Sequence, residues 1–505
     1  MKIAFVNDSC QRLGIQYISS MLKQGGHQTR LFIDPLLFYD EVLSWRRLNK
    51  LFDYKKSIIG QLKQYKPDLI GFSVVTDFYQ WACELAAAIK KEMNVPIIFG
   101  GIHPSSVPER VIKNDFVDIV CVGEGEYPML ELAESVKKGQ IDYSIKNLWF
   151  KKDGKIIANQ LRPLIDDLDS LPFADQEIYR NASPHFKKGY YIAADRGCPY
   201  ICSYCFHSYM RETYRGKGKY LRQRSVENVI CELEQAKRCY TPDLIFFLDD
   251  CFGRDLDWLR KFAIGYKKRI GINFHCSMFP GNVSLESLRL LKYAGCREIE
   301  IGVQTWDEKL RANLLQRVVS NEAMERAMLW IKKSGINLVS GEILGIPGET
   351  KDGLKQTVEI YGRIRPQRTF FFTLKYYPKT AIMRYACENN FFSKAEQEDI
   401  LDGKHGQQIS KGGDVTNGYV IQKISLFFLA KFLPLNIIMF IMRNNLYRYF
   451  PPFLTRTSLA IGENLMSFNL ESKHNRARAL YRYSYFMLSK IMYVFRKKRQ
   501  DYQSL

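Results

Sequence analysis

Short apolar runs alternate with longer stretches of helical period over residues 1 to about 140. The apolar runs are KIAFV, DLIGFSV, VPIIFGG and VDIVCVG, and the helical stretches cover 13–23, 81–91 and 129–136. A strand-length apolar run followed by a segment of 3.6-residue period predicts a βαβ unit and a mainly parallel sheet. We therefore expect residues 1–145 to form an α/β domain.

Glycines fall at or just past the expected carboxyl ends of three of these strands. They are Gly71, Gly100, Gly101, Gly123 and Gly125. Open α/β sheets bind ligands at the carboxyl ends of their strands, at a topological switch point. Glycines at equivalent places favour a ligand site, and the alternative is that they only form tight turns.

Residues 146–189 are expected to form a hairpin and a linker. The run LWFKKDGKIIANQ predicts a hairpin that turns at Asp153 and Gly154. The polar, proline-containing stretch RPLIDDLDSLPFADQEIYR predicts a linker on the surface.

A second alternation of strand-like and helix-like segments begins at Tyr190. The strand-like runs are YYIAA, LIFFL, INFHC, EIEIGV, NLVSGEIL and TFFFTL. The helix-like segments between them lie near 226–238, 256–268, 284–294, 321–334 and 351–364. Six such repeats predict a partial (β/α)6 TIM-like barrel over residues 190–390, with an active site at the carboxyl ends of its strands.

Residues 391–505 are expected to form a mostly helical, basic C-terminal region. The run 421–442 is apolar, but Lys431, Pro434 and Asn436 interrupt it before about 18 apolar residues accumulate. Residues 443–505 carry twelve Lys or Arg against three Asp or Glu. Two arrangements are open: contact with an anionic membrane surface, apolar side down, or a helical cap on the barrel mouth.

The composition favours an intracellular protein with an anionic partner. A chain of 505 residues is too long for one hydrophobic core, so two or three domains are expected. The formal net charge of +21 favours nucleic acid, a membrane surface or a phosphorylated substrate as the partner. The N-terminus MKIAFVNDSC lacks the apolar core of a signal peptide, so we expect a cytoplasmic location.

One cysteine cluster stands out among the twelve cysteines of the chain. The run RGCPYICSYC places Cys198, Cys202 and Cys205 in a C-x3-C-x2-C loop directly after the first barrel strand. Three thiolates can hold three irons of a [4Fe-4S] cluster and leave the fourth iron open for a small molecule. The alternative is zinc, whose closed sites need four ligands, and His207 is the nearby candidate for the fourth.

This cysteine spacing, with Tyr204 before the last cysteine, resembles the radical S-adenosylmethionine (SAM) superfamily. In that family the open iron binds SAM, and an electron from the cluster cleaves SAM to a 5′-deoxyadenosyl radical. The runs FFLDD, EIEIGVQT and LGIPGET also resemble motifs of the family. The resemblance implies SAM contacts at Tyr204, Asp249, Asp250, Glu300, Gly302, Gln304, Gly345, Pro347 and Gly348. For Asp249 and Asp250 the alternative is an N-cap of the next helix.

Two positions depart from the pattern of this family. The run YYPKT has Lys379 where the related enzymes commonly have glycine, and FHCSMFP has no arginine after the third strand, where many relatives have one. Both departures concern contacts with the substrate and leave the cluster ligands unaffected.

The first 140 residues resemble the Rossmann-like cobalamin (B12)-binding domain that is fused to a large class of radical SAM enzymes. The runs that carry the resemblance are LGIQYISSMLKQGGHQTRLFI, GFSVVT, FGGIHPSSVPE and CVGEGE. The implied cobalamin contacts are Ser73, Thr76, Gly100, Gly101, His103, Gly123, Glu124 and Gly125. The D-x-H-x-x-G motif of mutase-type cobalamin proteins is absent, because Asp8 is followed by Ser9 and Cys10.

These resemblances imply a radical SAM enzyme that uses a [4Fe-4S] cluster, SAM and cobalamin. The favoured reaction is methylation of an unactivated carbon, with cyclisation or rearrangement as the other reactions of this class. The expected partners are a small-molecule or lipid-like substrate and an electron donor such as flavodoxin or ferredoxin. Peripheral contact of the basic C-terminus with the inner face of the membrane is left open.

Two other hypotheses follow from the same residues. An RNA-modifying enzyme of the methylthiotransferase kind would suit the basic charge, but it needs a second cluster, and the spacing of Cys10, Cys83 and Cys121 does not resemble that motif. Nucleic acid is therefore not the favoured partner. The remaining hypothesis is a non-catalytic iron-sulfur sensor or scaffold.

Overall fold

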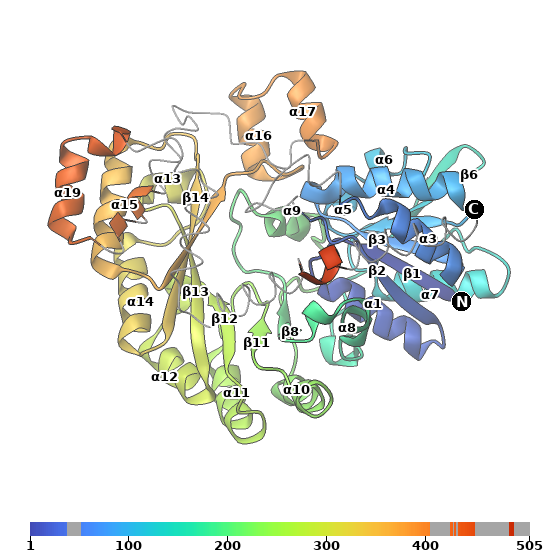
Figure 1. The fold of residues 1–505 in the computed structure, drawn as a ribbon, viewed down its shortest axis with the longest axis horizontal. Coiled ribbons are helices and arrows are strands. Elements are labelled where there is room, and N and C mark those ends of the chain that lie inside the picture. The colour runs from blue at the N-terminus through green and yellow to red at the C-terminus, as the bar shows by residue number, and fades with distance from the viewer. Residues whose placement is uncertain (38–51, 405–424, 428, 431–432, 450–483, 489–505) are drawn as a thin grey trace, which may run out of the picture.

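Two α/β domains, each built on its own sheet, lie side by side in the computed structural model (Figure 1). The structure describes all residues except 38–51, 405–424, 428, 431–432, 450–483 and 489–505. The N-terminal domain contains a seven-stranded sheet, and the second domain contains a six-stranded sheet. The predicted architecture of an α/β domain followed by a partial barrel is confirmed.

The N-terminal sheet has the order β2-β1-β3-β4-β5-β6-β7. Its strands are β1 (Lys2–Asn7), β2 (Gln28–Ile33), β3 (Leu69–Ser73), β4 (Ile97–Gly100), β5 (Ile119–Cys121), β6 (Leu148–Lys152) and β7 (Lys155–Ala158). The first five strands are parallel, so the chain reverses its direction of travel across the sheet between β1 and β3. This is the topological switch point at which a doubly wound sheet binds its ligand.

Helices cover this sheet in pairs. They are α1 (Leu13–Gln24), α3 (Lys55–Tyr65), α4 (Tyr79–Glu92), α5 (Ile102–Ser106), α6 (Pro108–Val111) and α7 (Glu126–Lys137). α1 packs against α7, and α3 packs against α4. The central strands β1, β3, β4 and β5 are buried on both faces, because the βαβ crossovers place apolar helix faces over each side of a parallel sheet.

The predicted hairpin is present and extends the first sheet. Asp153 and Gly154 both have positive φ, as the tightest hairpin turns require. Strand β6 pairs antiparallel with β5, so the hairpin is part of the N-terminal sheet rather than of a separate connecting segment. The linker that follows contains α8 (Glu177–Ala182).

The second domain is an open, six-stranded parallel barrel. Its strands, in spatial order from β8 to β15, are β8 (Tyr190–Ile192), β11 (Ile245–Phe247), β12 (Phe274–Met278), β13 (Cys296–Gln304), β14 (Asn337–Leu344) and β15 (Arg368–Thr373). The helices between them are α10 (Val226–Tyr240), α11 (Leu256–Arg269), α12 (Leu285–Ala294), α13 (Glu308–Asn313), α14 (Asn321–Lys333) and α15 (Lys351–Ile364). All six predicted strands and all five predicted helices are confirmed.

A short antiparallel ribbon precedes the first barrel helix. It pairs β9 (Asp195–Arg196) with β10 (Arg222–Gln223), and α9 (Phe206–Thr213) lies between the two strands in sequence. α9 lies beside α5 of the N-terminal domain (Figure 1), and Arg196 and Arg222 of the ribbon pair with Glu124 of that domain.

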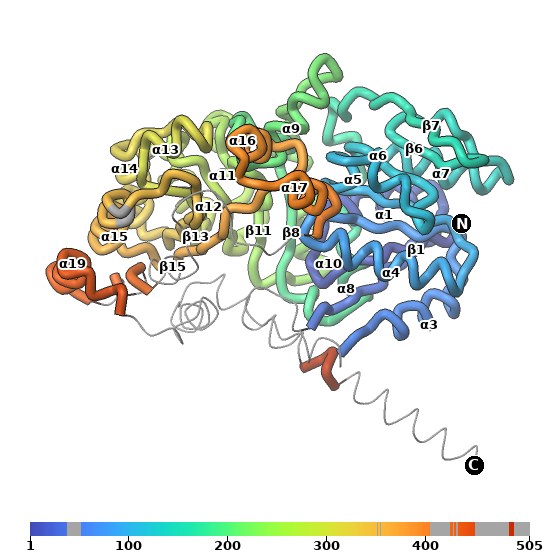
Figure 2. The backbone as a smooth tube through the Cα atoms, turned by 90° about the horizontal axis from the view of Figure 1, so that it is seen from above, coloured from blue at the N-terminus to red at the C-terminus, as the bar shows by residue number. Residues whose placement is uncertain are grey.

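Two helices after the barrel connect the domains. Seen from above, α16 (Ala381–Glu388) and α17 (Lys394–Leu401) lie over the junction (Figure 2). Arg110 of α6 pairs with Glu398 and with Asp402, the latter at 2.8 Å. The C-terminal region thus contacts the N-terminal domain as well as the barrel.

The described part of the apolar C-terminal run packs on the edge of the barrel and not on its mouth. Phe427 stacks on Phe371 of β15 with a ring distance of 5.2 Å, and α19 (Leu435–Arg443) packs against α15. This cover protects the last strand, which would otherwise present unpaired backbone groups. Most of the basic tail lies outside the described residues. Among the described helices, none is long and apolar enough to cross a membrane.

Candidate functional site

The three cysteines of the C-x3-C-x2-C motif lie in the cysteine loop, residues 197–205, between β9 and α9. Ser203 anchors this loop, because its N–H donates to the Leu315 carbonyl at 2.9 Å and its hydroxyl to the Leu314 carbonyl at 2.6 Å. The N–H of Ile382 in α16 donates to the Ser203 carbonyl at 3.0 Å. The loop is therefore held by the segment after α13 and by the start of α16.

Burial and ligand type at this loop both fit an iron-sulfur cluster. Cys202 is buried, and Cys198 and Cys205 are half-buried. Burial raises the pKa of Cys198 to about 12 and that of Cys205 to about 11, so their thiolates need a cationic partner such as the irons of a cluster. In the described part of the chain no three His, Cys, Asp or Glu side chains converge on one ion. A [4Fe-4S] cluster does not need the three thiolates to converge on one ion, because each thiolate binds a different iron.

Arg317 lies beside the cysteines, although nothing in its sequence context indicated a role. Its Nη1 is 3.8 Å from Cys202 Sγ, and its Nη2 donates to the Gly302 carbonyl at 2.7 Å. The guanidinium stacks on Phe279, 4.6 Å from the ring centre. Its buried Nε has no hydrogen-bond partner among the described residues, which suits a carboxylate such as that of SAM. Phe279 belongs to the run FHCSMFP, so an arginine does reach the end of the third strand, from elsewhere in the chain.

Asp249 fulfils a structural role at the end of β11. Its Oδ1 accepts hydrogen bonds from the N–H groups of Ala194 and Asp195, at 2.8 and 2.7 Å. Burial and the neighbouring Asp195 raise the pKa of Asp249 well above its usual range. The alternative role of an N-cap is wrong, because Asp255 caps the next helix. Asp249 therefore fixes the end of β8, just before the cysteine loop.

Asp250 faces the cysteine loop from the same strand end. Its Oδ2 lies 2.8 Å from His207 Nε2, and His207 Nδ1 lies 2.8 Å from the hydroxyl of Tyr220. His207 is thus held between a carboxylate and a phenol. Asp250 is the one of the two predicted aspartates whose side chain is partly exposed.

Four of the predicted SAM residues surround one cavity at the mouth of the barrel, the barrel cavity, with a volume of about 390 Å³. They are Tyr204, Glu300, Gly302 and Gln304. Gln304 has a φ of +68° at a register shift of β13, and such strained backbone is concentrated at functional sites. The carboxylate, amide and phenol groups of this set fit a polar, cationic ligand such as SAM.

The LGIPGET segment lies partly outside this cavity. Pro347 and Gly348 line a neighbouring groove together with Leu310 of α13 and Tyr385 of α16. Gly345 has a φ of +77°, a conformation that favours glycine, and its N–H donates to Glu349 Oε2 at 3.1 Å. The structure therefore does not bring these three residues together with the other predicted SAM contacts.

The N-terminal domain closes one side of the barrel cavity. Asp77, which follows β3, accepts hydrogen bonds through Oδ2 from Lys375 Nζ at 2.9 Å and from the Tyr377 hydroxyl at 3.3 Å. All three residues line the cavity. The other oxygen, Oδ1, is buried and has no partner among the described residues. It is therefore available to a hydrogen-bond donor of a ligand.

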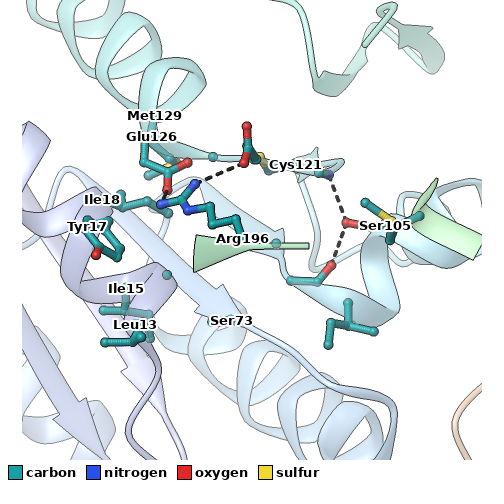
Figure 3. Close-up of a pocket in the computed structure, with 18 of the residues that line it drawn as sticks. Leu13, Ile15, Tyr17, Ile18, Ser73, Ser105, Cys121, Glu126, Met129 and Arg196 are labelled. Carbon is teal, nitrogen blue, oxygen red and sulfur yellow. Dashed lines mark hydrogen bonds and ion pairs between the residues drawn. The ribbon is translucent and has the colours of Figure 1, made fainter. Parts of the chain in front are cut away.

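A second cavity of about 400 Å³, the interdomain cavity, lies at the switch point of the first sheet (Figure 3). Its apolar wall includes Leu13, Ile15, Ile18 and Met129. The predicted cobalamin residues that line it are Ser73, Gly100, Gly101, Gly123, Glu124 and Gly125. The cysteine loop borders it through Gly197.

Glycines give this cavity its shape. Gly101 has a φ of +100°, and a methyl group there would lie 2.8 Å from the backbone N and O of Val74. Gly123 has a φ of +82°, and a methyl group there would lie 1.7 Å from the hydroxyl oxygen of Tyr214. Glycine at these two positions therefore lets the cavity wall pack closely against Val74 and Tyr214, and the wall leaves space for a ligand such as a corrin.

Thr76 and His103 lie behind the cavity wall. His103 Nδ1 is 3.2 Å from Thr76 Oγ1, and the imidazole stacks on Tyr79 with a ring distance of 4.0 Å. Burial lowers the pKa of His103 to about 4, so the ring is neutral at physiological pH. These two predicted contacts therefore belong to the packing of the domain.

The site residues that the sequence did not indicate share one property. Asp77, Arg196, Arg222 and Arg317 lie on the two cavities or beside the cysteines, and each meets its partner only across the fold. A charged residue close to a motif was the available signal, as with Arg196, which lies two residues before Cys198.

Two family models match the chain. Residues 195–360 match the model of the radical SAM superfamily, and residues 3–133 match the model of the B12 binding domain. The two matched ranges contain the cysteine loop and the strand ends that line the interdomain cavity.

The chain is similar in sequence to two relatives and in fold to a solved structure. The uncharacterized methyltransferase PH0819 of Pyrococcus horikoshii is 26% identical over 390 residues, which cover 75% of this chain and 79% of the relative. The anaerobic magnesium-protoporphyrin IX monomethyl ester cyclase of Rubrivivax gelatinosus is 24% identical, over 68% of this chain and 61% of the relative. The cobalamin-dependent radical SAM enzyme OxsB, solved with aqua-cobalamin and SAM, superimposes with a TM-score of 0.65 at 17% identity, over 95% of this chain and 72% of OxsB.

Proposed function

This chain belongs to the radical SAM enzymes that carry a B12-binding domain, and from that membership we propose that it methylates an unactivated carbon of a small molecule. Its cofactors are a [4Fe-4S] cluster, SAM and cobalamin. One observation carries the proposal: the cysteine loop borders both cavities, through Tyr204 on the barrel cavity and Gly197 on the interdomain cavity. The two cavities thus meet at the cluster ligands.

We propose specific roles for the residues around the cavities. Cys198, Cys202 and Cys205 would hold the cluster, and Tyr204, Glu300, Gln304 and Arg317 would orient SAM beside it. When bound, the cluster and SAM would supply the 5′-deoxyadenosyl radical, and cobalamin would supply a transferable methyl group. The apolar wall of the interdomain cavity keeps water away from the ligand that the cavity would hold. The reaction also requires an electron donor such as flavodoxin or ferredoxin.

Cyclisation and rearrangement are the competing reactions within the same family. The two relatives differ in the type of reaction that their names give, because one is named a methyltransferase and the other a cyclase. Incubation with SAM that carries a deuterated methyl group separates them. Methylation adds the label to the product, whereas cyclisation or rearrangement leaves the product unlabelled.

A methylthiotransferase role receives less support from the structure. Cys10 is exposed after β1, Cys83 lies in α4, and Cys121 is buried in β5. They lie on three separate segments, whereas Cys198, Cys202 and Cys205 share one short loop. The described residues therefore provide ligands for one cluster, at the cysteine loop.

The test of the cofactor assignment measures iron, sulfide and corrinoid on one anaerobic sample of the full chain. We expect about four irons and one corrinoid per chain. Cys202→Ser should lose most of the iron, because a buried ligand is removed, and Cys239→Ser, at an exposed cysteine far from the loop in sequence, should keep it. Full iron in Cys202→Ser would refute the proposed ligand set.

We further propose that the outer face of α19 and the turn after it contacts an anionic membrane. Ile437, Phe440 and Tyr449 are 42%, 60% and 83% exposed. Residues 415–462 contain no Asp or Glu, whereas Arg443 and Arg448 add positive charge to this face. Exposed apolar side chains among basic residues favour an interfacial position on anionic lipid, from which a lipid-like substrate could be drawn.

Sedimentation with vesicles tests this contact. We expect the protein to sediment with vesicles that contain anionic phosphatidylglycerol and not with pure phosphatidylcholine. Phe440→Ser should reduce the bound fraction severalfold, and Val318→Ser, a control at an apolar residue that is 79% exposed elsewhere, should not. Equal binding of all three proteins would argue against α19 as the contact.

A further inference from the structure

Four charged side chains join the two domains at one end of the interdomain cavity. Glu124 and Glu126 belong to the N-terminal domain, and Arg196 and Arg222 belong to the β9–β10 ribbon of the barrel. Arg196 Nη1 lies 3.1 Å from Glu124 Oε1, and its Nη2 lies 2.7 Å from Glu126 Oε1 (Figure 3). Arg222 Nη1 lies 2.8 Å from the same Glu124 oxygen. Two carboxylates and two guanidiniums thus form one neutral group.

This group is built into the fold rather than placed on its surface. Glu126 and Arg222 are buried, at 4% and 6% exposure. Glu124 Oε2 also accepts from the Ile165 N–H at 2.9 Å, and Arg222 Nη1 donates to the Ile165 carbonyl at 2.8 Å. Because unpaired buried charges are strongly unfavourable, each arginine requires its carboxylate partners. The Glu124 carboxylate, predicted as a cobalamin contact, is therefore engaged by the other domain.

Arg196 connects this group directly to the cysteine loop. It lies two residues before Cys198, with Gly197 between them. Gly197 has a φ of +91°, and a methyl group there would lie 2.3 Å from the Tyr220 carbonyl oxygen. The backbone between Arg196 and Cys198 is therefore tightly packed, and a shift of Arg196 moves the first cluster ligand.

All four side chains also line the interdomain cavity, at its polar end. A ligand in the cavity displaces water from beside the ion pairs. Charges attract more strongly as the local dielectric constant falls, so the ligand strengthens the pairs that hold Arg196. Conversely, a bound cluster fixes the cysteine loop, and the fixed loop holds Arg196 and the adjoining wall of the interdomain cavity in place.

From this geometry we infer that Glu124 and Glu126 are positioning residues that couple the interdomain cavity to the cluster ligands. Cobalamin in the cavity stabilises the cluster, and the cluster in turn favours cobalamin binding, because the coupling between two sites is reciprocal. The inference rests on the proposed function, since it assumes that the cavity holds cobalamin. It goes beyond that function in assigning communication between the two cofactor sites to named side chains.

The experiment measures the rate at which the cluster loses iron. The full chain with a reconstituted cluster is mixed anaerobically with a ferrous chelator, with and without saturating hydroxocobalamin, and the absorbance of the iron complex is followed. For the wild type we expect cobalamin to slow iron release about fivefold or more. In Glu126→Gln we expect this ratio to fall towards one. The matched control is Glu131→Gln, on the same helix, whose partner Arg162 lies outside the group; it should keep the wild-type ratio.

The ratio separates positioning from general stability. A variant that merely destabilises the protein releases iron faster both with and without cobalamin, and its ratio stays at the wild-type value; that result in Glu126→Gln overturns the inference. Arg196→Lys provides a second variant, which keeps the charge but loses the two-pronged contact, and we expect an intermediate ratio. A wild-type ratio of one with one corrinoid bound per chain also overturns the inference and leaves the proposed function intact. If no corrinoid binds to the wild type, the proposed function fails first.

Discussion

Asp34 directly follows strand β2, and its carboxyl group has almost no contact with water. It is 4% exposed, and it accepts hydrogen bonds from Trp81 Nε1 at 2.9 Å and from the Leu36 N–H at 3.1 Å. Burial outweighs these bonds and raises the pKa of Asp34 to about 6. The environment of one residue therefore decides its charge near neutral pH.

This shift predicts a pH-dependent stability. Because the pKa is raised in the folded state, the contribution of Asp34 is fully present below its unfolded pKa of about 4 and is lost as the pH rises through about 6. Between these values the free energy of unfolding of the wild type should fall, relative to Asp34→Asn, by up to about 3 kcal/mol. Urea unfolding at several pH values measures the difference.

The control for this measurement is Asp142→Asn. The bonds from Ser144 lower the pKa of the exposed Asp142, so its contribution is lost as the pH falls and the trend has the opposite sign. A constant difference between the wild type and Asp34→Asn over the whole range would show that the pKa of Asp34 is the same in the folded and the unfolded protein.

One departure from the family pattern, Lys379, stands at a strained position of the backbone. It has a φ of +66°, a conformation in which glycine is favoured, and the related enzymes commonly have glycine there. Lys379→Gly should therefore raise the free energy of unfolding by about 0.5 kcal/mol, the relief of strain less the added entropy of the unfolded chain. Lys261→Gly, within α11, should lower it by about 1 kcal/mol. Thermal unfolding of both variants tests the opposite signs.

At the scale of elements, the turn after β5 shapes the wall of the interdomain cavity. Gly123 ends this strand and faces Tyr214, which follows α9 of the other domain. The turn can approach α9 this closely because no side chain stands between them. The same packing brings Glu124 within reach of the β9–β10 ribbon.

Gly123→Ala should disturb both the turn and the cavity. The added methyl group clashes with Tyr214, so we expect lower stability and cobalamin affinity reduced tenfold or more, measured by corrinoid absorbance. Gly139→Ala is the matched control, because Gly139 has nearly the same φ, +81°, but nothing within 4 Å. It should cost about 1 kcal/mol of stability and leave cobalamin binding unchanged. Equal effects of the two substitutions would exclude the close approach as the cause.

At the scale of the whole molecule, the domains meet at both cavities. Asp77 and Lys375 close the barrel cavity, and the four-residue ionic group closes the interdomain cavity. Helices α16 and α17 span the junction above them (Figure 2). Entry of ligands therefore depends on how tightly the domains hold each other.

Loss of the Asp77–Lys375 pair should loosen the contact between the domains at the barrel cavity and leave their contact at the interdomain cavity unchanged. In Asp77→Asn we expect faster hydrogen exchange of backbone amides at 76–79 and 374–377, with exchange at the β9–β10 ribbon unchanged. The pair is partly exposed, so its contribution should be about 0.5–1 kcal/mol. Glu92→Gln, which breaks an exposed pair within the N-terminal domain, should leave both interdomain regions unchanged. Faster exchange at the ribbon in Asp77→Asn would show that the two contacts act as one.

Local patterns in the sequence determined the elements of both domains and the cysteine set. Each predicted strand and helix of the barrel follows from periodicity within about 15 residues, and the hairpin follows from Asp153 and Gly154. The cysteine ligands lie within one short loop, so their spacing alone indicates a cluster. Such features are local, because backbone hydrogen bonding and side-chain alternation are decided by near neighbours.

The tertiary structure alone decided which charged residues meet. Arg317 reaches Cys202 over 115 residues, Arg196 reaches Glu126 over 70, and Lys375 reaches Asp77 over 298. It also decided that Asp249 and His103 serve the packing of the fold, while Asp250 pairs with His207 and Glu124 pairs with arginines of the other domain. Charged side chains have no periodic signature, and burial and partners arise only when distant strand ends are brought to the same edge of a sheet.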